Sequence, residues 1–133
     1  MRMAGWAAVL ALGGCATAPE PMVLRFGGML PCAGCPGIAT ELTLTRGGVG
    51  YAEGTYRLEE TYLGRGPQVT TGEWTTLRGD AADPDAAVYE LDPDHPERAR
   101  HFKRLGADRA LQALNRELKP WPGRAPDRLQ RKD

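Results

Sequence analysis

The sequence lacks several features that would point to a familiar class of function. Its 133 residues carry 17 Lys and Arg against 17 Asp and Glu, so no excess charge favours a nucleic-acid partner. It contains no GxSxG motif, no phosphate-binding loop and no paired histidines. Its apolar runs are also shorter than the ~20 residues that a membrane-spanning helix needs. We therefore expect a protein that is not an enzyme and does not bind nucleic acid.

Glycine and proline, by contrast, are abundant, with 17 and 11 residues. Both residues interrupt helices and occur in turns, so their excess favours short strands. Polar and apolar residues alternate along much of the chain, and this period of two is typical of half-buried strands. The pattern predicts strands at residues 38–45, 55–63, 69–77, 87–91, 100–105 and 109–114, with a first strand after Met22.

Residues 96–118 admit a second interpretation, because they hold strong helix formers with leucines at helical spacing. Gly106 interrupts that helix, and residues 106–108 have the length of a hairpin loop, which favours strands. Successive antiparallel strands joined by tight turns form a meander, and closing it into a barrel removes its exposed edges. We therefore predict an all-β fold, a small antiparallel meander barrel over residues 23–118.

Two segments have unusual charge patterns. Residues 80–97 hold seven acidic side chains and no Lys or Arg, which predicts a solvated loop. Residues 119–133 hold three prolines and five basic groups against two acidic ones, which predicts a disordered tail.

The N-terminus has the layout of a secretory signal peptide. One positive charge at Arg2 precedes apolar residues 3–12, and the run ends in small residues. Residues 12–15, LGGC, look like a bacterial lipobox, in which Cys15 becomes the first mature residue and carries the lipid. An ordinary secretory signal with an unmodified cysteine is the alternative.

The lipobox resemblance divides this end of the chain into two parts. It implies a lipoprotein signal peptide at residues 1–14 and a lipidated tether at residues 15–22. Ala16, in place of an aspartate, resembles the signal for sorting to the outer membrane. We therefore expect a bacterial protein anchored through Cys15 to the periplasmic face of the outer membrane. The anchor should be stable, because lipoproteins of this kind carry several acyl chains.

The two remaining cysteines, Cys32 and Cys35, form a CxxC pair, which is compatible with three kinds of chemistry. A structural zinc site needs four ligands, and no second cysteine pair is present. A thioredoxin-type dithiol needs a helix after its first cysteine, and Pro36 followed by a β-patterned run opposes one. Cu(I) accepts a few soft thiolate and thioether ligands, and Met29 lies just before the pair.

A structural disulfide is the competing interpretation, because an exported CxxC pair is readily oxidised. Oxidised Cys32 and Cys35 could not bind copper as thiolates, so the redox state would control metal binding. The residues therefore leave two possibilities open. One is a Cu(I) site made by Cys32, Cys35 and Met29, and the other is a Cys32–Cys35 disulfide with no cofactor.

The cysteine pair lies in GMLPCAGCPGIAT at residues 28–40, which is followed by LTL at 42–44, ETYLG at 60–64 and GEW at 72–74. In order and spacing these segments resemble the N-terminal domain of the NlpE family of copper-resistance and envelope-stress lipoproteins. ALQALNRE at 110–117 matches the family's final strand more weakly. Gly34 departs from the family, in which an acidic residue is common at this position. The family's longer members also carry a second domain, for which we expect no room in this chain.

The resemblance implies a lipocalin-like barrel on the outer membrane, with Cys32 and Cys35 at the positions proposed for metal or redox work. It also implies a role in copper homeostasis or resistance, or in reporting envelope stress to a sensor protein. The alternative function is a non-metal interaction module, or a barrel that binds a small apolar ligand, with a structural disulfide. The expected partners are the membrane, through Cys15, and an envelope sensor protein.

Overall fold

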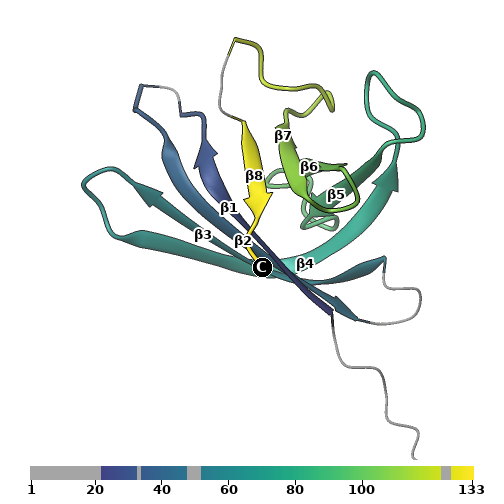
Figure 1. The fold of residues 1–133 in the computed structure, drawn as a ribbon, viewed down its shortest axis with the longest axis horizontal. Coiled ribbons are helices and arrows are strands. Elements are labelled where there is room, and N and C mark those ends of the chain that lie inside the picture. The colour runs from purple at the N-terminus through teal and green to yellow at the C-terminus, as the bar shows by residue number, and fades with distance from the viewer. Residues whose placement is uncertain (1–21, 33, 48–51, 124–126) are drawn as a thin grey trace, which may run out of the picture.

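The computed structural model in Figure 1 describes residues 22–32, 34–47, 52–123 and 127–133. These residues form eight antiparallel strands that close into a barrel in sequence order. The strands are β1 (Met22–Leu30), β2 (Ile38–Gly47), β3 (Glu53–Tyr62), β4 (Pro67–Arg78), β5 (Ala87–Leu91), β6 (Arg100–Leu105), β7 (Ala110–Leu114) and β8 (Arg128–Arg131). The prediction of an all-β antiparallel meander barrel is confirmed. In the described part of the chain no helix is long and apolar enough to span a membrane.

The predicted strands agree closely with the observed ones, and the helical interpretation of residues 96–118 is wrong. That segment contains β6 and β7, which pair through a short turn at Gly106. Gly106 and the next two residues all have positive φ, a conformation that no helix can contain. The turn therefore overrides the helix propensity of its neighbours.

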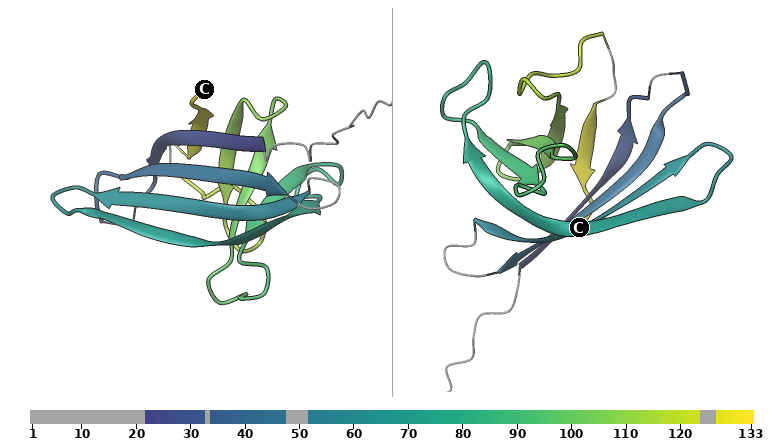
Figure 2. Two further views of the ribbon diagram at one scale, coloured as in Figure 1. Left: turned by 90° about the horizontal axis from the view of Figure 1, so that it is seen from below. Right: turned by 180° about the vertical axis from the view of Figure 1, so that it is seen from behind.

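The two halves of the barrel differ in strand length. β1 to β4 have 9 to 12 residues, and β5 to β8 have 4 to 6. Figure 2 shows the long strands as one curved wall, which the shorter strands close from the other side. The long hairpins therefore project beyond the short ones, and this leaves one end of the barrel open.

Large side chains fill the barrel interior between its two ends. Trp74 packs edge-to-face on Tyr89, with ring centroids 5.2 Å apart at 71°. The Trp74 indole N–H also donates to the backbone oxygen of Thr45 at 3.3 Å. The inward side chains of the other strands complete this core, and they include Leu24, Phe26, Leu42, Leu44, Tyr56, Leu58, Leu91, Phe102, Leu111 and Leu129.

A buried ionic group seals the end of the barrel opposite the opening. Asp108, in the β6–β7 turn, accepts a hydrogen bond from the Tyr89 hydroxyl at 2.6 Å and one from Arg46 at 3.1 Å. Burial, and then the Asp108 carboxylate, raise the pKa of Tyr89 to about 12. The phenol therefore stays neutral at ordinary pH and holds the carboxylate in place.

The prediction of a solvated loop at residues 80–97 is wrong for two of its acids. Asp80 accepts a hydrogen bond from Lys103 at 2.8 Å, and this bond lowers the pKa of the Asp80 carboxyl. Asp92 is buried and accepts a hydrogen bond from the Tyr56 hydroxyl at 2.7 Å. The charge pattern alone gave no sign of these partners, because they come from distant strands.

The prediction that residues 119–133 form a disordered tail is wrong for the segment that forms β8. This strand pairs with β7 on one side and with β1 on the other, so it closes the barrel. Its side chain Leu129 is fully buried in the core. The sequence analysis missed β8 because a single apolar residue among basic ones gives no period-two pattern.

We predict that Leu129→Ala lowers the free energy of unfolding by about 2–5 kcal/mol, because it leaves a cavity in a packed core. Gln130→Ala is the matched control, since Gln130 is the exposed neighbour on the same strand, and its effect should stay within about 0.5 kcal/mol. Urea unfolding followed by circular dichroism measures both variants. Equal effects of the two substitutions would contradict the placement of β8.

Candidate functional site

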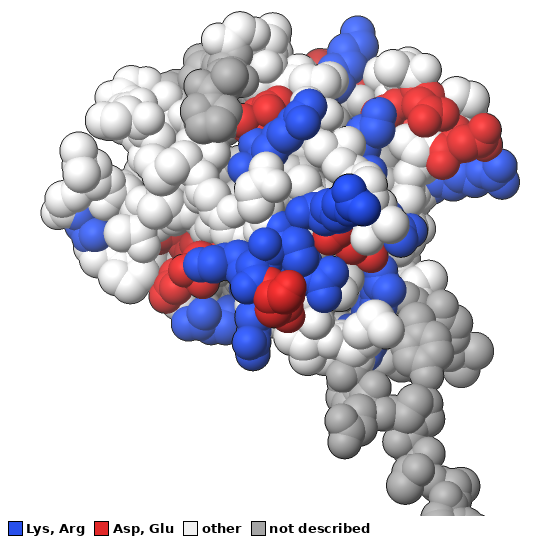
Figure 3. Space-filling view, in the orientation of Figure 1, with Lys and Arg blue, Asp and Glu red and all other residues white. Residues whose placement is uncertain are grey.

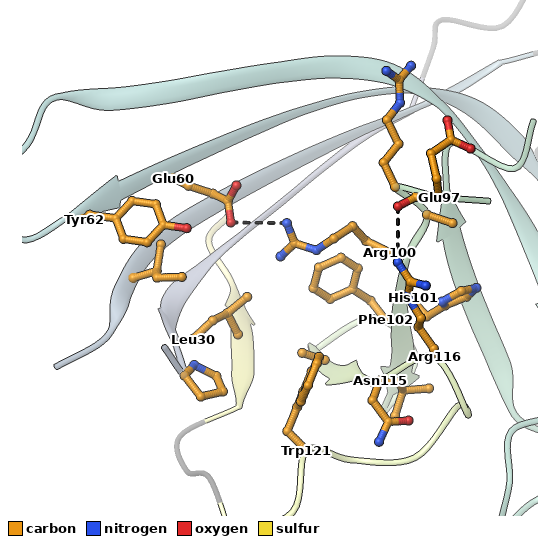
Figure 4. A pocket seen from close by; sticks show the side chains of 16 residues that line it. Leu30, Glu60, Tyr62, Glu97, Arg100, His101, Phe102, Asn115, Arg116 and Trp121 are labelled. Atoms are coloured by element: carbon orange, nitrogen blue, oxygen red, sulfur yellow. Dashed lines mark hydrogen bonds and ion pairs between the residues drawn. The ribbon is translucent and has the colours of Figure 1, made fainter. Parts of the chain in front are cut away.

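The open end of the barrel gathers four connections. Because neighbouring strands run in opposite directions, the links β1–β2, β3–β4, β5–β6 and β7–β8 all lie at this end. Between them is a cavity of about 360 Å³, which we call the mouth cavity (Figure 4). Leu30, Ile38, Phe102 and Ala113 supply its apolar lining, and Glu60, Arg100, Arg116 and Trp121 are among its other residues.

The CxxC loop, residues 32–35, borders this cavity. Cys32 and Cys35 form a disulfide, with their Cα atoms 5.4 Å apart, and both residues are half-buried. The disulfide alternative of the sequence analysis is therefore the state that the structure shows. Leu30 and Ile38, which flank the loop, line the mouth cavity, so the disulfide holds one part of its rim.

Met29 lies on the outer face of β1, beside the base of the CxxC loop. Its side chain is 43% exposed, and its partner on β2 is Ala39. Gly37 makes room for it, because a Cβ atom at Gly37 would lie 2.8 Å from the Met29 methyl carbon. The structure thus places the Met29 thioether against the segment that follows Cys35.

The donor groups at this loop fit copper only after reduction. In the disulfide, neither Cys32 nor Cys35 is a thiolate, and Cu(I) requires thiolate or thioether donors. Reduction would give two thiol groups with the Met29 thioether nearby. Within the described ranges, no group of three or more His, Cys, Asp or Glu side chains could hold a metal ion. The predicted lipidation site, Cys15, lies outside the described residues.

A second hollow, the outer groove, runs along the outside of the barrel next to the CxxC loop. It has a volume of about 430 Å³ and is lined mainly by apolar groups from Met29, Pro36, Tyr62 and Leu63. Leu63 is 78% exposed. Figure 3 shows the charged side chains interleaved across the middle of this view and mostly uncharged atoms toward the tip of the β3–β4 hairpin.

Two ion pairs near the mouth were missed by the sequence analysis. Glu60 on β3 and Arg100 on β6 form an ion pair at 3.2 Å across the mouth cavity (Figure 4). Beside it, Asp92 accepts from Tyr56 and lies 3.4 Å from the Arg98 Nε. Burial, and then the hydrogen bond to Asp92, raise the pKa of Tyr56. The strand period could have placed Glu60 inside, since it shares a face with Leu58.

Gly72 is required where β4 passes the buried Asp92. A side chain at this position would collide with the Asp92 carboxylate and with the Tyr56 ring. The GEW segment of the sequence therefore has a physical reason for its glycine. It lets β4 approach the Tyr56–Asp92 pair closely, and Trp74 then enters the core two residues later.

Comparisons with known proteins give one result. Residues 26–124 match the family described as the NlpE N-terminal domain. The match runs from the middle of β1 to beyond β7 and includes the CxxC loop and the mouth cavity. No match was found among curated proteins, and none among solved structures.

We predict that opening the disulfide destabilises the protein without unfolding it. Cross-linking so short a loop contributes at most about 2 kcal/mol, so Cys32→Ser/Cys35→Ser should lose about that amount or less. The reduced wild type is the matched control, and it should unfold at the same urea concentration as the double variant. Two alkylated cysteines in unreduced protein, or equal stability of oxidised and reduced protein, would contradict a structural contribution from this bond.

Proposed function

The chain belongs to the NlpE family through its N-terminal domain, and on that premise we propose a lipid-anchored protein of the outer membrane that handles copper at its CxxC loop. Family membership supports an envelope protein. The copper role, the anchor at Cys15 and the periplasmic orientation are our proposals. A role in binding copper agrees with a site that combines the Cys32–Cys35 disulfide, the Met29 thioether and the adjacent mouth cavity. The observation that carries the proposal is the position of the Met29 side chain beside Gly37, two residues after the disulfide-bonded Cys35.

The proposed cycle begins with reduction of the disulfide. A dithiol reductant donates two electrons and two protons, so it becomes a disulfide while Cys32 and Cys35 become thiols. Binding of Cu(I) then displaces the thiol protons, because metals bind the thiolate form. Met29 adds a third soft donor. A thiol oxidant that accepts two electrons, such as a disulfide reduced to a dithiol, would form the Cys32–Cys35 disulfide again, and the Cu(I) ion would be released with the loss of its thiolate ligands.

The half-buried position of the pair suits this exchange. A reductant must reach one sulfur atom to form a mixed disulfide, and full burial would prevent that attack. Pro31 and Pro36 on either side of the pair limit the conformations of the loop, which reduces the entropy lost when two sulfurs bind one ion. The loop is thus accessible and already bent.

We predict that the reduced protein binds one Cu(I) ion and that the oxidised protein does not. Cys32→Ser/Cys35→Ser should abolish binding, and Met29→Leu should weaken it by roughly tenfold, because one of the three soft donors is lost. Met22→Leu is the control, because Met22 is an exposed thioether at the opposite end of β1. Anaerobic competition with a chromophoric Cu(I) chelator measures all five proteins. Equal affinity in the reduced wild type and the double cysteine variant would end the copper proposal.

The second candidate is an interaction module with a permanent disulfide, and the outer groove favours it. The groove presents exposed apolar side chains beside the disulfide, and such patches commonly contact other proteins. The partner would be the envelope sensor protein expected from the family. A disulfide that persists in protein taken from the envelope, together with no copper binding after reduction, would select this candidate.

We predict that Cys15 carries the lipid anchor. Labelling cells with an alkyne analogue of palmitate should mark the wild-type protein, and Cys15→Ser should abolish the label because the modified thiol is absent. Cys35→Ser is the control and should keep the label. A wild-type protein without label, or a label that survives Cys15→Ser, would show that the lipobox interpretation is wrong.

A further inference from the structure

The mouth cavity has features of a ligand site that the copper proposal does not use. We propose that it binds a small amphipathic carboxylate, with the hydrocarbon part against its apolar lining and the carboxylate at Arg100 and Arg116. Its volume of about 360 Å³ lies at the small end of the range typical of ligand pockets, roughly 300–1,000 Å³. The ligand is therefore a short chain or a single ring.

The filled core limits how deep a ligand can reach. Trp74, Phe26 and Tyr89 are nearly completely buried and occupy the barrel below the mouth. A purely apolar ligand would have to enter that packed region to leave water completely. A ligand held at the mouth keeps one end near solvent, and a charged end suits that position. The packing therefore favours an amphipathic ligand.

Beside the mouth cavity, β4 and β5 are paired over only part of the length of β4. β5 pairs with β4 only from Trp74 to Arg78, so the first half of β4 pairs with β3 alone. β5 ends at Leu91, and the chain then turns away through Asp92. At the level of the mouth, the ion pair of Glu60 and Arg100 spans the gap between β3 and β6 (Figure 4). Side chains from both of these strands line the mouth cavity.

The charges around the cavity favour an anion. Arg98, Arg100 and Arg116 line it together with Glu60 and Glu97, and Arg98 already forms an ion pair with Asp92 at 3.4 Å. Glu60 is largely buried and engages Arg100, whereas Arg116 forms no ion pair within the described part of the chain and donates a hydrogen bond to the backbone oxygen of Glu97 at 3.3 Å. The Arg116 guanidinium is therefore the one arginine of the three that a ligand carboxylate can approach without breaking an ion pair among the described residues. The two glutamates oppose a second negative charge, which favours a monoanionic carboxylate over a phosphate ester.

Arg100 lies where the charged part of the mouth cavity meets its apolar part. Its guanidinium lies 5.8 Å from the centroid of the Phe102 ring, which forms part of the apolar lining. One guanidinium nitrogen bonds to Glu60, and the others are available for a ligand carboxylate. The hydrocarbon part of the ligand would then lie against Phe102, Leu30 and Ala113. The residues that would contact the carboxylate thus lie beside those that would contact the hydrocarbon part, as an amphipathic ligand requires.

Trp121 gives the site a built-in reporter. It lines the cavity and is 44% exposed, whereas Trp74 is buried in the core. The test uses the mature chain without its lipid, residues 16–133, which contains every strand. We expect octanoate to change the Trp121 fluorescence in a saturable way, and to bind more tightly than octyl glucoside, octylammonium or octyl phosphate. Trp121→Phe should lose the fluorescence change but still retain labelled octanoate in equilibrium dialysis.

Substitutions locate the carboxylate. Arg116→Gln should weaken octanoate binding by roughly tenfold, the usual effect of losing a charged hydrogen bond. Glu60→Gln/Arg100→Gln should weaken it similarly without leaving an unpaired buried charge. Arg78→Gln is the control, because Arg78 forms an exposed ion pair with Asp85 at the other end of β4. Thermal unfolding without ligand shows which variants are folded, and dialysis is compared only among these.

Three results would overturn the proposal. These are an absence of saturable octanoate binding, equal binding of octanoate and octyl glucoside, or full binding by both the Arg116→Gln and the Glu60→Gln/Arg100→Gln proteins. None of them bears on copper, because the Cu(I) titration uses Cys32, Cys35 and Met29. Failure of either proposal therefore leaves the other standing.

Discussion

The packing of Trp74 inside the barrel is the interaction on which the rest of this molecule depends. Its ring fills the interior against Tyr89, and its N–H ties β4 to the backbone of β2. With the interior occupied, a barrel of eight strands has little space left for a ligand. The features on which the proposed binding roles rest accordingly lie at the rim, where the CxxC loop, the mouth cavity and the outer groove are found.

Much of the fold follows from local patterns in the sequence. The alternation in β2 shows directly which residues face inward, and Leu42 and Leu44 are indeed buried while Glu41 is exposed. β8 could not be found in this way, because its placement depends on the edges of β1 and β7, which only the folded barrel presents. Closure of a barrel is a property of all its strands together, and local patterns do not contain it.

The candidate site likewise has one part that the sequence predicts and another that only the fold brings together. Cys32, Cys35 and Met29 lie within seven residues of one another, so their proximity follows from the sequence. Glu60 and Arg100 are 40 residues apart and meet because β4 and β5 separate at the mouth. Asp92 and Tyr56 meet across Gly72 of β4, where the missing side chain leaves room for both. Short-range chemistry was therefore predictable, and charge pairing across the barrel was not.

The CxxC loop and the mouth cavity share residues, so they are physically coupled. Leu30 and Ile38 anchor the two ends of the loop and also line the cavity. They are directly paired across β1 and β2, which fixes the loop ends whether or not the disulfide is present. The disulfide constrains the loop above that pair, including Pro31 on the cavity side. A ligand that contacts Pro31 would bind the two redox states with different affinity, and by linkage its binding would shift the redox equilibrium of the pair by the same free energy.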